Sequence, residues 1–134
     1  MIPKIIHYCW FGRNPIPAEY QRYIESWKKF LPDYEIKEWN EDNFDVNIIP
    51  FTKEAYDVKK YAYVSDYARL KILYDNGGVY FDTDVEVIRN MDDINAAGAW
   101  MAVEKHASSP GLRHLSLIHL SLIHISEPTR RTPI

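Results

Sequence analysis

Segments with the apolar spacing of a strand alternate along this chain with segments that have the apolar spacing of a helix. Short runs with the alternation or continuous apolar character of a strand are followed by longer runs with the i, i+3, i+4 spacing of a helix. The predicted strands cover residues 5–11, 34–39 and 79–88, with a further one at 99–103. The predicted helices cover residues 18–30 and 61–76, with another stretch starting at 52–56 and a short helix or turn near 92–94. Strands and helices in this order favour an α/β fold with a largely parallel sheet.

Glycine and proline mark the ends of these segments. Gly12 and the stretch Pro15–Pro17 separate the first strand from the first helix, and Pro32 follows the end of that helix. Gly77 and Gly78 stop the long helix, because glycine adopts the left-handed conformation at a helix end without strain.

The composition excludes several classes of protein. The net charge of −3 gives no electrostatic reason to expect nucleic acid binding. No apolar run approaches the ~20 residues of a membrane-spanning helix, and the first residues do not have the pattern of a signal peptide. Cys9 is the only cysteine, which fits a reducing compartment. We therefore expect a cytoplasmic protein, peripheral at the inner face of the membrane if its partner is a lipid.

The last twenty residues differ from the rest. Leu115–His119 is repeated at once as Leu120–His124, a period that matches neither strand nor helix. The segment 120–130 also closely resembles a translated sequencing-library adapter. We therefore expect an authentic domain over residues 1–113 and a non-native tail over 114–134, in which His114, His119 and His124 are not a metal cluster. The alternative is a real edge strand followed by a disordered end.

Tyr80, Asp82 and Asp84 are two residues apart in a predicted strand, so they are expected to project to one face. The residues between them are apolar or β-branched and would face the core. Two carboxylates at the open end of a strand can bind a hard cation such as Mg²⁺ or Mn²⁺. Alone this pattern is weak, because ten Asp in 134 residues give about 0.7 Asp-x-Asp pairs by chance. A solvated turn would then be the simpler interpretation.

The long helix carries a second charged pair. Asp66 and Arg69 are three residues apart and therefore share a face. Asp66 also lies on a stripe that is otherwise apolar or aromatic, so its carboxylate is expected to need partners. The other members of this stripe are Tyr63, Tyr67, Leu70 and Tyr74. Taken alone, a plain helical ion pair is the simpler interpretation of Asp66 and Arg69, but the glycine turn can bring both into one cleft with Asp82 and Asp84.

These residues together form a longer string with fixed spacings. It reads Ser65-Asp66-x-x-Arg69, then Leu73, then Gly77-Gly78-x-Tyr80-x-Asp82-x-Asp84. This string resembles the signature of glycosyltransferases with the DXD sugar-binding region. That family includes yeast initiating mannosyltransferases, bacterial capsular-polysaccharide transferases and the glucosylating domain of clostridial toxins. The N-terminal Ile6-His7-x-x-Trp10-x-Gly12 resembles the first strand of the family, so the likeness covers roughly residues 1–105.

The resemblance implies a role for each matching residue. Asp66 would bind hydroxyls of the donor sugar, and Arg69 would lie beside the sugar and the diphosphate, which makes these two the catalytic candidates. Asp82 and Asp84 would hold Mn²⁺ or Mg²⁺, Asp84 more directly and Asp82 partly through water, so that Asp82 also belongs to the donor site.

Two aromatic residues complete the implied donor site. Trp10 would stack on the base of the nucleotide, or alternatively be a core tryptophan at the end of a strand. Tyr80 would contact the donor or its phosphates, or alternatively pack inside the protein. We interpret His7 as a residue that orders the first strand, and Trp27 and Trp39 as core residues.

The resemblance also implies a fold and a reaction. The fold would be the Rossmann-like A-type glycosyltransferase fold, with a mostly parallel sheet. The reaction would move a sugar from a UDP- or GDP-sugar to a glycan or lipid-linked acceptor hydroxyl and retain the anomeric configuration. Family members continue well beyond residue 113, so we expect this chain to be a C-terminally truncated donor-binding part with little or no activity.

Two other functions remain open from the sequence. One is a phosphatase of the haloacid-dehalogenase type, in which an Asp-x-Asp pair follows an apolar strand. In that class the motif usually sits on the first strand, whereas about 80 residues precede it here. The other is a non-catalytic module that binds nucleotide sugars.

Overall fold

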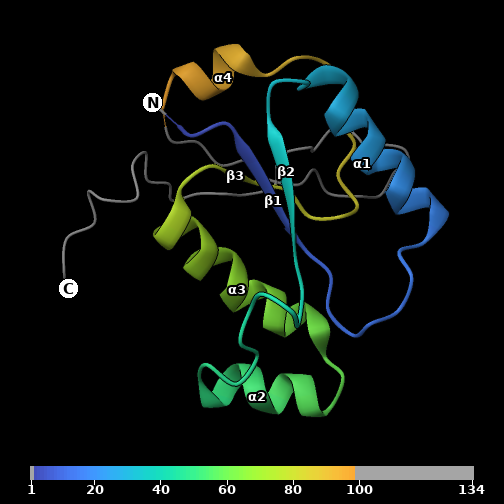
Figure 1. Ribbon diagram of the computed structural model, residues 1–134, viewed down its shortest axis with the longest axis vertical. Coiled ribbons are helices and arrows are strands. Elements are labelled where there is room, and N and C mark those ends of the chain that lie inside the picture. Colours follow the sequence, from blue (N-terminus) through green and yellow to red (C-terminus); the bar gives the residue numbers. More distant parts are fainter. Residues whose placement is uncertain (1, 99–134) are drawn as a thin grey trace, which may run out of the picture.

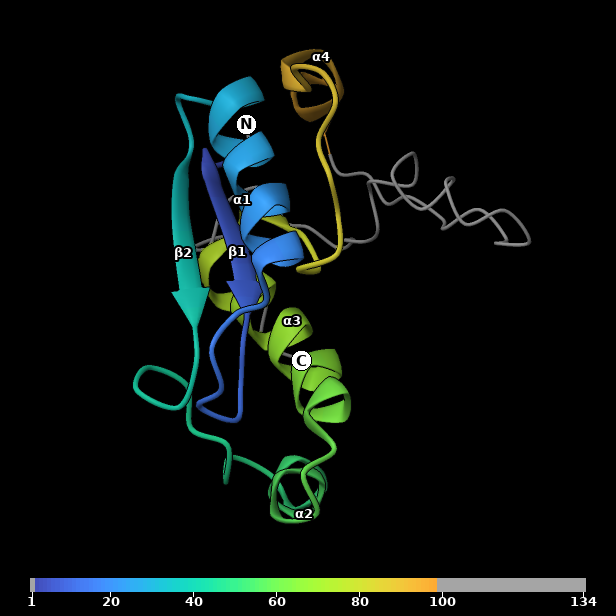
Figure 2. The ribbon, with the colours of Figure 1, turned by 90° about the vertical axis from the view of Figure 1, so that its right-hand side faces the viewer.

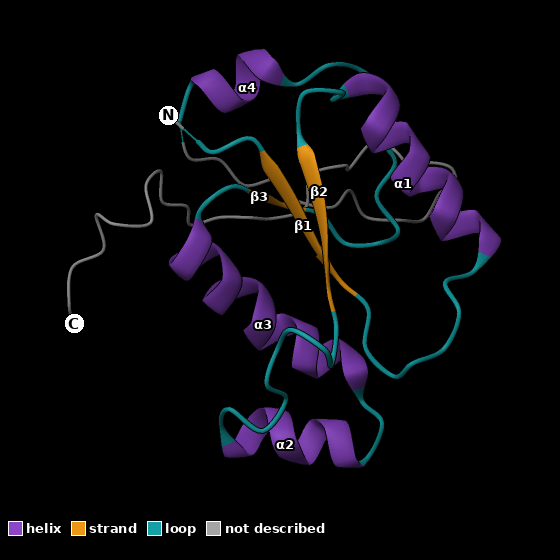
Figure 3. Cartoon of the chain, viewed as in Figure 1, coloured by secondary structure: helices purple, strands orange, loops and turns teal. Residues whose placement is uncertain are grey.

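A small parallel sheet forms the centre of the molecule. The computed structural model describes residues 2–98, and in them the chain forms β1 (Ile5–Cys9), α1 (Ala18–Phe30), β2 (Glu35–Trp39), α2 (Pro50–Asp57), α3 (Tyr61–Asn76), β3 (Val79–Tyr80) and α4 (Asp92–Ala96). The described strands lie in the order β2-β1-β3, and both pairings are parallel. The predicted α/β class with a parallel sheet is therefore confirmed (Figures 1 and 3).

The central strand β1 is held along both of its sides. Ile6 pairs with Ile36 of β2 and with Val79 of β3. The Trp10 backbone N–H donates to the Trp39 carbonyl at 2.9 Å, which continues the β1–β2 ladder by one residue. Because parallel strands need a crossover to connect them, each neighbour of β1 arrives after a helical segment.

Helix α1 covers one face of the sheet. Ile6 and Tyr8 of β1 point to this face and pack with Ile24 and Trp27 of α1. Trp27 is completely buried, and its indole N–H donates to the Val85 carbonyl at 2.8 Å. The Trp27 side chain thus links the segment after β3 to α1. The prediction that Trp27 is a core residue is confirmed.

Helix α3 covers the opposite face, as Figure 1 shows. Cys9 and Tyr80 point to this side, because side chains alternate along a strand. The helix residues that pack on them are Val64, Ala68, Ile72 and Leu73. Helix α2 lies against α3, and Figure 2 shows it at the opposite end of the molecule from α4.

The apolar stripe predicted on the long helix is not its buried face. Tyr63 and Leu70 are about half exposed, at 51% and 50%, and the Asp66 side chain is 56% exposed. The stripe therefore faces mostly outward, and burial does not force a partner on Asp66. The expectation that this stripe is the buried face was wrong, because the helix has apolar residues on more than one side. The side with the smaller residues Val64 and Ala68 is the buried one, since small side chains let the helix approach the sheet more closely.

The third strand is much shorter than the predicted 79–88. After Tyr80, the Phe81 N–H donates to the His7 carbonyl, and the Val85 N–H then closes a turn on the Asp82 carbonyl at 3.1 Å. Val87 N–H donates to the Ser26 hydroxyl of α1 rather than to a strand. The apolar alternation continues because one side of this segment packs on α1. The prediction of a strand over 79–88 was therefore wrong, because a segment that is buried on one side shows the same two-residue alternation without pairing to another strand.

Two predictions concern residues beyond those described. The strand predicted at 99–103 and the tail at 114–134 lie outside residues 2–98. Within the described part of the chain, none of the helices is long and apolar enough to cross a membrane.

We predict that Trp27→Phe lowers the free energy of unfolding by about 1–3 kcal/mol, because it removes the hydrogen bond to Val85 and leaves a space in the core. Lys28→Ala is the matched control on the same helix, where the side chain is 58% exposed and pairs with Glu25. It should cost no more than about 0.5 kcal/mol. Urea unfolding measures both, and equal losses would contradict the role given to Trp27.

Candidate functional site

A pocket of about 470 Å³ opens where β1 and β3 end. The chain passes from β1 to β2 on one side and later returns to β3 on the other side, so the gap between β1 and β3 is a switch point in the topology. Ligands of open α/β sheets bind at such points, outside the carboxyl ends of the strands. Trp10 lines the pocket from the end of β1, Asp82 from the end of β3, and Tyr61 from the start of α3. A volume of this size suits a small-molecule ligand.

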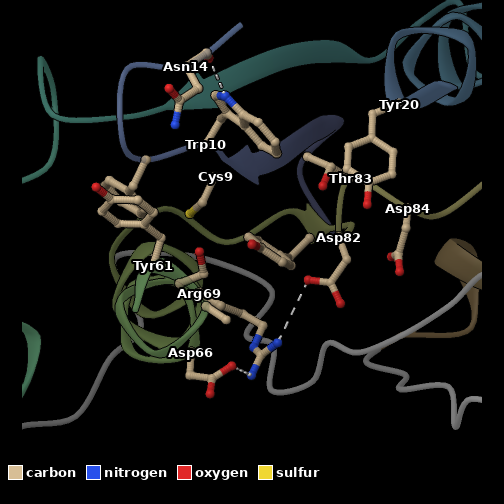
Figure 4. Close-up of a pocket in the computed structure, with 14 residues that line it drawn as sticks. Cys9, Trp10, Asn14, Tyr20, Tyr61, Asp66, Arg69, Asp82, Thr83 and Asp84 are labelled. Carbon is tan, nitrogen blue, oxygen red and sulfur yellow. Dashed lines mark hydrogen bonds and ion pairs between the residues drawn. The ribbon is translucent and has the colours of Figure 1, made fainter. Parts of the chain in front are cut away.

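Arg69 lies at the centre of the charged side of the pocket (Figure 4). One guanidinium nitrogen, Nη2, lies 3.3 Å from Asp66 Oδ1, and the other, Nη1, lies 4.0 Å from Asp82 Oδ1. The guanidinium also stands over the Tyr80 ring, 5.8 Å from its centroid. The helix and the turn after β3 therefore meet through this one side chain, which is 25% exposed and open to a ligand.

Asp82 and Asp84 lie in the turn after β3, and both line the pocket. Figure 4 shows Asp82 turned toward Arg69, with Asp84 farther from it. In residues 2–98 no group of three or more His, Cys, Asp and Glu side chains could hold a metal ion. Two carboxylates still fit Mg²⁺ or Mn²⁺, since such ions are commonly held by one or two carboxylates together with phosphates of the substrate.

Tyr80 is buried beneath this charged group rather than exposed beside Asp82. It is 2% exposed and packs in the same buried cluster as Cys9. Burial raises the pKa of Tyr80 well above its usual value, and burial likewise raises the pKa of Cys9 to about 12. Both groups are therefore neutral, and Tyr80 forms a floor under Arg69. It was wrong to expect Tyr80 on one open face with the two aspartates, because Asp82 and Asp84 have left the strand.

Trp10 forms part of the opposite wall. Its indole N–H donates to the Asn14 carbonyl at 2.7 Å, and its ring meets Tyr20 edge to face at 6.0 Å. Asn14 and Tyr20 line the pocket as well. Hydrogen bonding and ring contact fix the orientation of Trp10 and leave it partly exposed toward the pocket.

The structure thus brings all six residues predicted for the donor and metal site to one pocket. The roles given to Trp10, Asp66, Arg69, Tyr80, Asp82 and Asp84 stay predictions. Sequence reasoning missed Asn14, Tyr20, Tyr61 and Thr83. A signal existed for Tyr61, because Tyr61, Ser65 and Arg69 are spaced by four and so lie along one helical face.

Buried His7 connects the sheet to the turn that leads into the site. Its Nδ1 accepts the indole N–H of Trp39 at 3.0 Å, so the ring proton belongs on Nε2, which donates to the Gly77 carbonyl at 2.9 Å. The neighbouring Gly78 has a φ of +100°, and a Cβ there would lie 2.8 Å from the Ile5 carbonyl oxygen. His7 therefore orders β1 as predicted, and Trp39 is partly buried against the α3 side.

Comparison with known proteins gives a consistent match. A protein-family model described as a glycosyltransferase sugar-binding region containing a DXD motif matches residues 17–100. An uncharacterized glycosyltransferase of Acanthamoeba polyphaga mimivirus is 36% identical over 111 residues, which is 78% of this chain and 44% of that protein. Inositol phosphoceramide mannosyltransferase 3 of Schizosaccharomyces pombe is 35% identical over 104 residues, 75% of this chain and 29% of that protein. The chain therefore spans less than half the length of these relatives.

We predict a loss of stability between pH 6.5 and pH 4 that is caused by His7. Burial lowers the pKa of His7, the hydrogen bond to Gly77 partly opposes this, and the charge of Lys37 adds a smaller lowering, so that the pKa falls from 6.5 to about 4. Between pH 6.5 and pH 4, His7 is therefore protonated in the unfolded chain but neutral in the folded chain. The free energy of unfolding is highest above pH 6.5 and falls as the pH is lowered through this range. The loss is on the order of 3 kcal/mol.

Urea unfolding at several pH values between 7 and 4 measures this loss. His7→Gln, which cannot titrate but can keep a donor and an acceptor, should remove most of the pH dependence in that window. If the variant kept the dependence of the wild type, the assignment to His7 would be wrong.

Proposed function

This chain belongs to the family of glycosyltransferases whose sugar-binding region contains a DXD motif, and on that premise we propose that it binds a nucleoside-diphosphate sugar for transfer to an acceptor hydroxyl. The observation that carries the proposal is the meeting of Asp66 and Arg69 from α3 with Asp82 and Asp84 from the turn after β3 in one pocket. Sugar hydroxyls need acceptors, and a diphosphate needs cationic donors, so this set offers a partner for each part of such a donor.

The balance of charge in the pocket supports a divalent cation. Among residues 2–98, three carboxylates, those of Asp66, Asp82 and Asp84, line it together with one guanidinium, that of Arg69. A diphosphate would be repelled by this set unless a cation joined it. We infer that Asp82 and Asp84 hold Mg²⁺ or Mn²⁺, which would supply neutralisation of the charge that develops on the leaving diphosphate.

The protein residues would then divide the binding between them. Asp66, exposed at the rim, would accept hydrogen bonds from the donor sugar. Arg69 would bind the diphosphate, because Tyr80 beneath it and Asp66 beside it hold its planar guanidinium in place. The partly exposed ring of Trp10 would stack on the base, since an aromatic face suits any base.

The sugar and the acceptor are proposed from the relatives. Two of them, both from Schizosaccharomyces pombe, bear the name inositol phosphoceramide mannosyltransferase. We therefore propose a hexose donor such as a GDP- or UDP-linked mannose or glucose, with a glycan or a lipid-linked acceptor. We also propose that the transfer retains the anomeric configuration and takes place in the cytoplasm.

We predict that UDP or GDP raises the melting temperature only when Mn²⁺ is present. A ligand at 100 times its dissociation constant stabilises the folded state by about 2.7 kcal/mol. Asp84→Asn should abolish the shift, because it removes one of the two proposed metal ligands. The matched control is Asp57→Asn on α2, where the carboxylate pairs with Lys53 at 2.9 Å outside the pocket. It should leave the shift unchanged.

An assay of donor hydrolysis separates this function from its alternatives. Release of UDP or GDP from a nucleotide sugar in the presence of Mn²⁺, lost in Asp84→Asn, would support the transferase. Binding without any turnover would support the donor site, as expected both for a truncated donor-binding part and for a non-catalytic module. Release of phosphate from a monoester, or a complete lack of nucleotide binding, would contradict the proposal.

A further inference from the structure

We propose that Glu41 is a positioning residue for the donor. Its carboxylate accepts a hydrogen bond from the backbone of Gly12 and thereby keeps Trp10 and Asn14 in place on the pocket wall. The inference rests on the proposed function, since it concerns the end of the pocket assigned to the nucleotide base. Glu41 itself does not line the pocket and so would act through the residues that it holds.

Glu41 is a carboxylate in an enclosed position. Only 10% of its side chain is exposed. Its Oε2 accepts the backbone N–H of Gly12 at 2.6 Å and the hydroxyl of Tyr56 at 2.9 Å. Its Oε1 makes no hydrogen bond within residues 2–98 and lies 3.7 Å from Nε of Arg13. The contacts of this one side chain therefore join the loop after β1 to α2.

The ionised form of Glu41 is the one that the structure favours. Burial raises the pKa of this carboxyl, but the hydrogen bonds from Gly12, from its own backbone and from Tyr56 lower it, as does the charge of Arg13. The net effect is a pKa below the usual value. The hydrogen bonds to Gly12 and Tyr56 are thus assisted by charge, which makes them stronger than neutral ones.

The turn that carries Glu41 is itself held firmly. The Asn40 N–H donates to Asn43 Oδ1, and the Asp42 N–H donates to Asn40 Oδ1, each at 2.8 Å. Asn43 also donates from its side chain to the Glu38 carbonyl at the end of β2. A carboxylate on such a turn has a fixed place relative to the sheet and can fix what it binds.

The loop that Glu41 binds has an unusual backbone. Gly12 has a φ of +105°, and the next residue, Arg13, has a φ of +66° although it is not glycine. Such conformations persist where the surroundings hold them. Gly12 also passes so close to Tyr61 that a Cβ would lie 2.6 Å from the ring. Because Tyr61 in turn contacts the Tyr56 ring at 5.5 Å, the contacts from Glu41 close into a circuit around this end of the pocket.

The same loop carries two residues of the pocket wall. Trp10 precedes the bend and Asn14 follows it, and they are joined by the hydrogen bond from the indole to the Asn14 carbonyl. A shift at Gly12 would move Asn14 and release the Trp10 ring. The charged end of the pocket, with Arg69 and Asp82, is held by α3 and β3 and would not move.

The experiment compares a ligand that has a base with one that has none. Calorimetric titration of the purified chain with UDP, GDP and pyrophosphate, each with Mn²⁺, gives three dissociation constants. We expect Glu41→Ala to weaken the tighter of UDP and GDP about tenfold and to leave pyrophosphate within about twofold. Glu41→Gln keeps an acceptor oxygen for Gly12 but loses the charge, so it should weaken the nucleotide only about threefold.

Asp42→Ala is the matched control. Asp42 also pairs with Arg13, at 2.8 Å, but its side chain is 69% exposed. It should change neither the nucleotide nor the pyrophosphate constant by more than about twofold.

A double-mutant cycle tests whether Glu41 acts through Trp10. In a Trp10→Ala background, Glu41→Ala should weaken nucleotide binding by less than about twofold, because the ring that it positions is absent. A merely structural role would give the same loss in both backgrounds.

The outcomes separate this inference from the proposed function. If the wild-type chain bound neither UDP nor GDP, the proposed function would fail. If it bound one of them and Glu41→Ala changed nothing, or weakened pyrophosphate equally, the inference would be overturned while the proposed function stood. Should Glu41→Ala not fold, Glu41→Gln decides by the same selective loss.

Discussion

The two hydrogen bonds of His7 hold together the segments from which the pocket is built. Parallel strands have no tight hairpin to fix their offset, so their alignment must come from contacts between side chains and backbone across the sheet. The imidazole reaches Trp39 at the end of β2 and Gly77 between α3 and β3. One neutral ring therefore sets how β1, β2 and the turn before β3 lie relative to one another.

The charged residues of the candidate site lie on two kinds of structure, a regular helix and an irregular turn. Asp66 and Arg69 stand on a helix of 16 residues, and the floor beneath Arg69 is a buried, neutral tyrosine. Asp82 and Asp84 stand on a turn, where the backbone can place two carboxylates on the same side without the constraint of a pleat. The charged groups that would meet a diphosphate thus have independent supports, and the aromatic wall with Trp10 has a third support in Glu41.

The sequence predicted the helices well and the third strand badly. The bounds 18–30 and 61–76 agree with α1 and α3 because Pro17 and Gly77 mark their ends. The apolar alternation over 79–88 arises because this segment is buried against α1. Periodicity alone does not distinguish such burial from pairing with another strand. For the site, the string from Asp66 to Asp84 predicted that its charged residues could share one cleft, and they line one pocket. Glu41 gave no such signal, since its bond to Gly12 spans 29 residues that only the fold brings together.

The sheet order has a consequence for how the chain acquires its binding site. Ile6 pairs with Ile36 on one side and with Val79 on the other, so one edge of β1 stays open until nearly the whole described chain has been made. An open edge can pair with another chain, which makes this interval the one most exposed to aggregation. The segment that closes the edge also carries Asp82 and Asp84. The step that pairs β3 with β1 therefore also brings the acidic side of the pocket into place, so the carboxylates proposed to hold a metal ion reach Arg69 only when this pairing has formed.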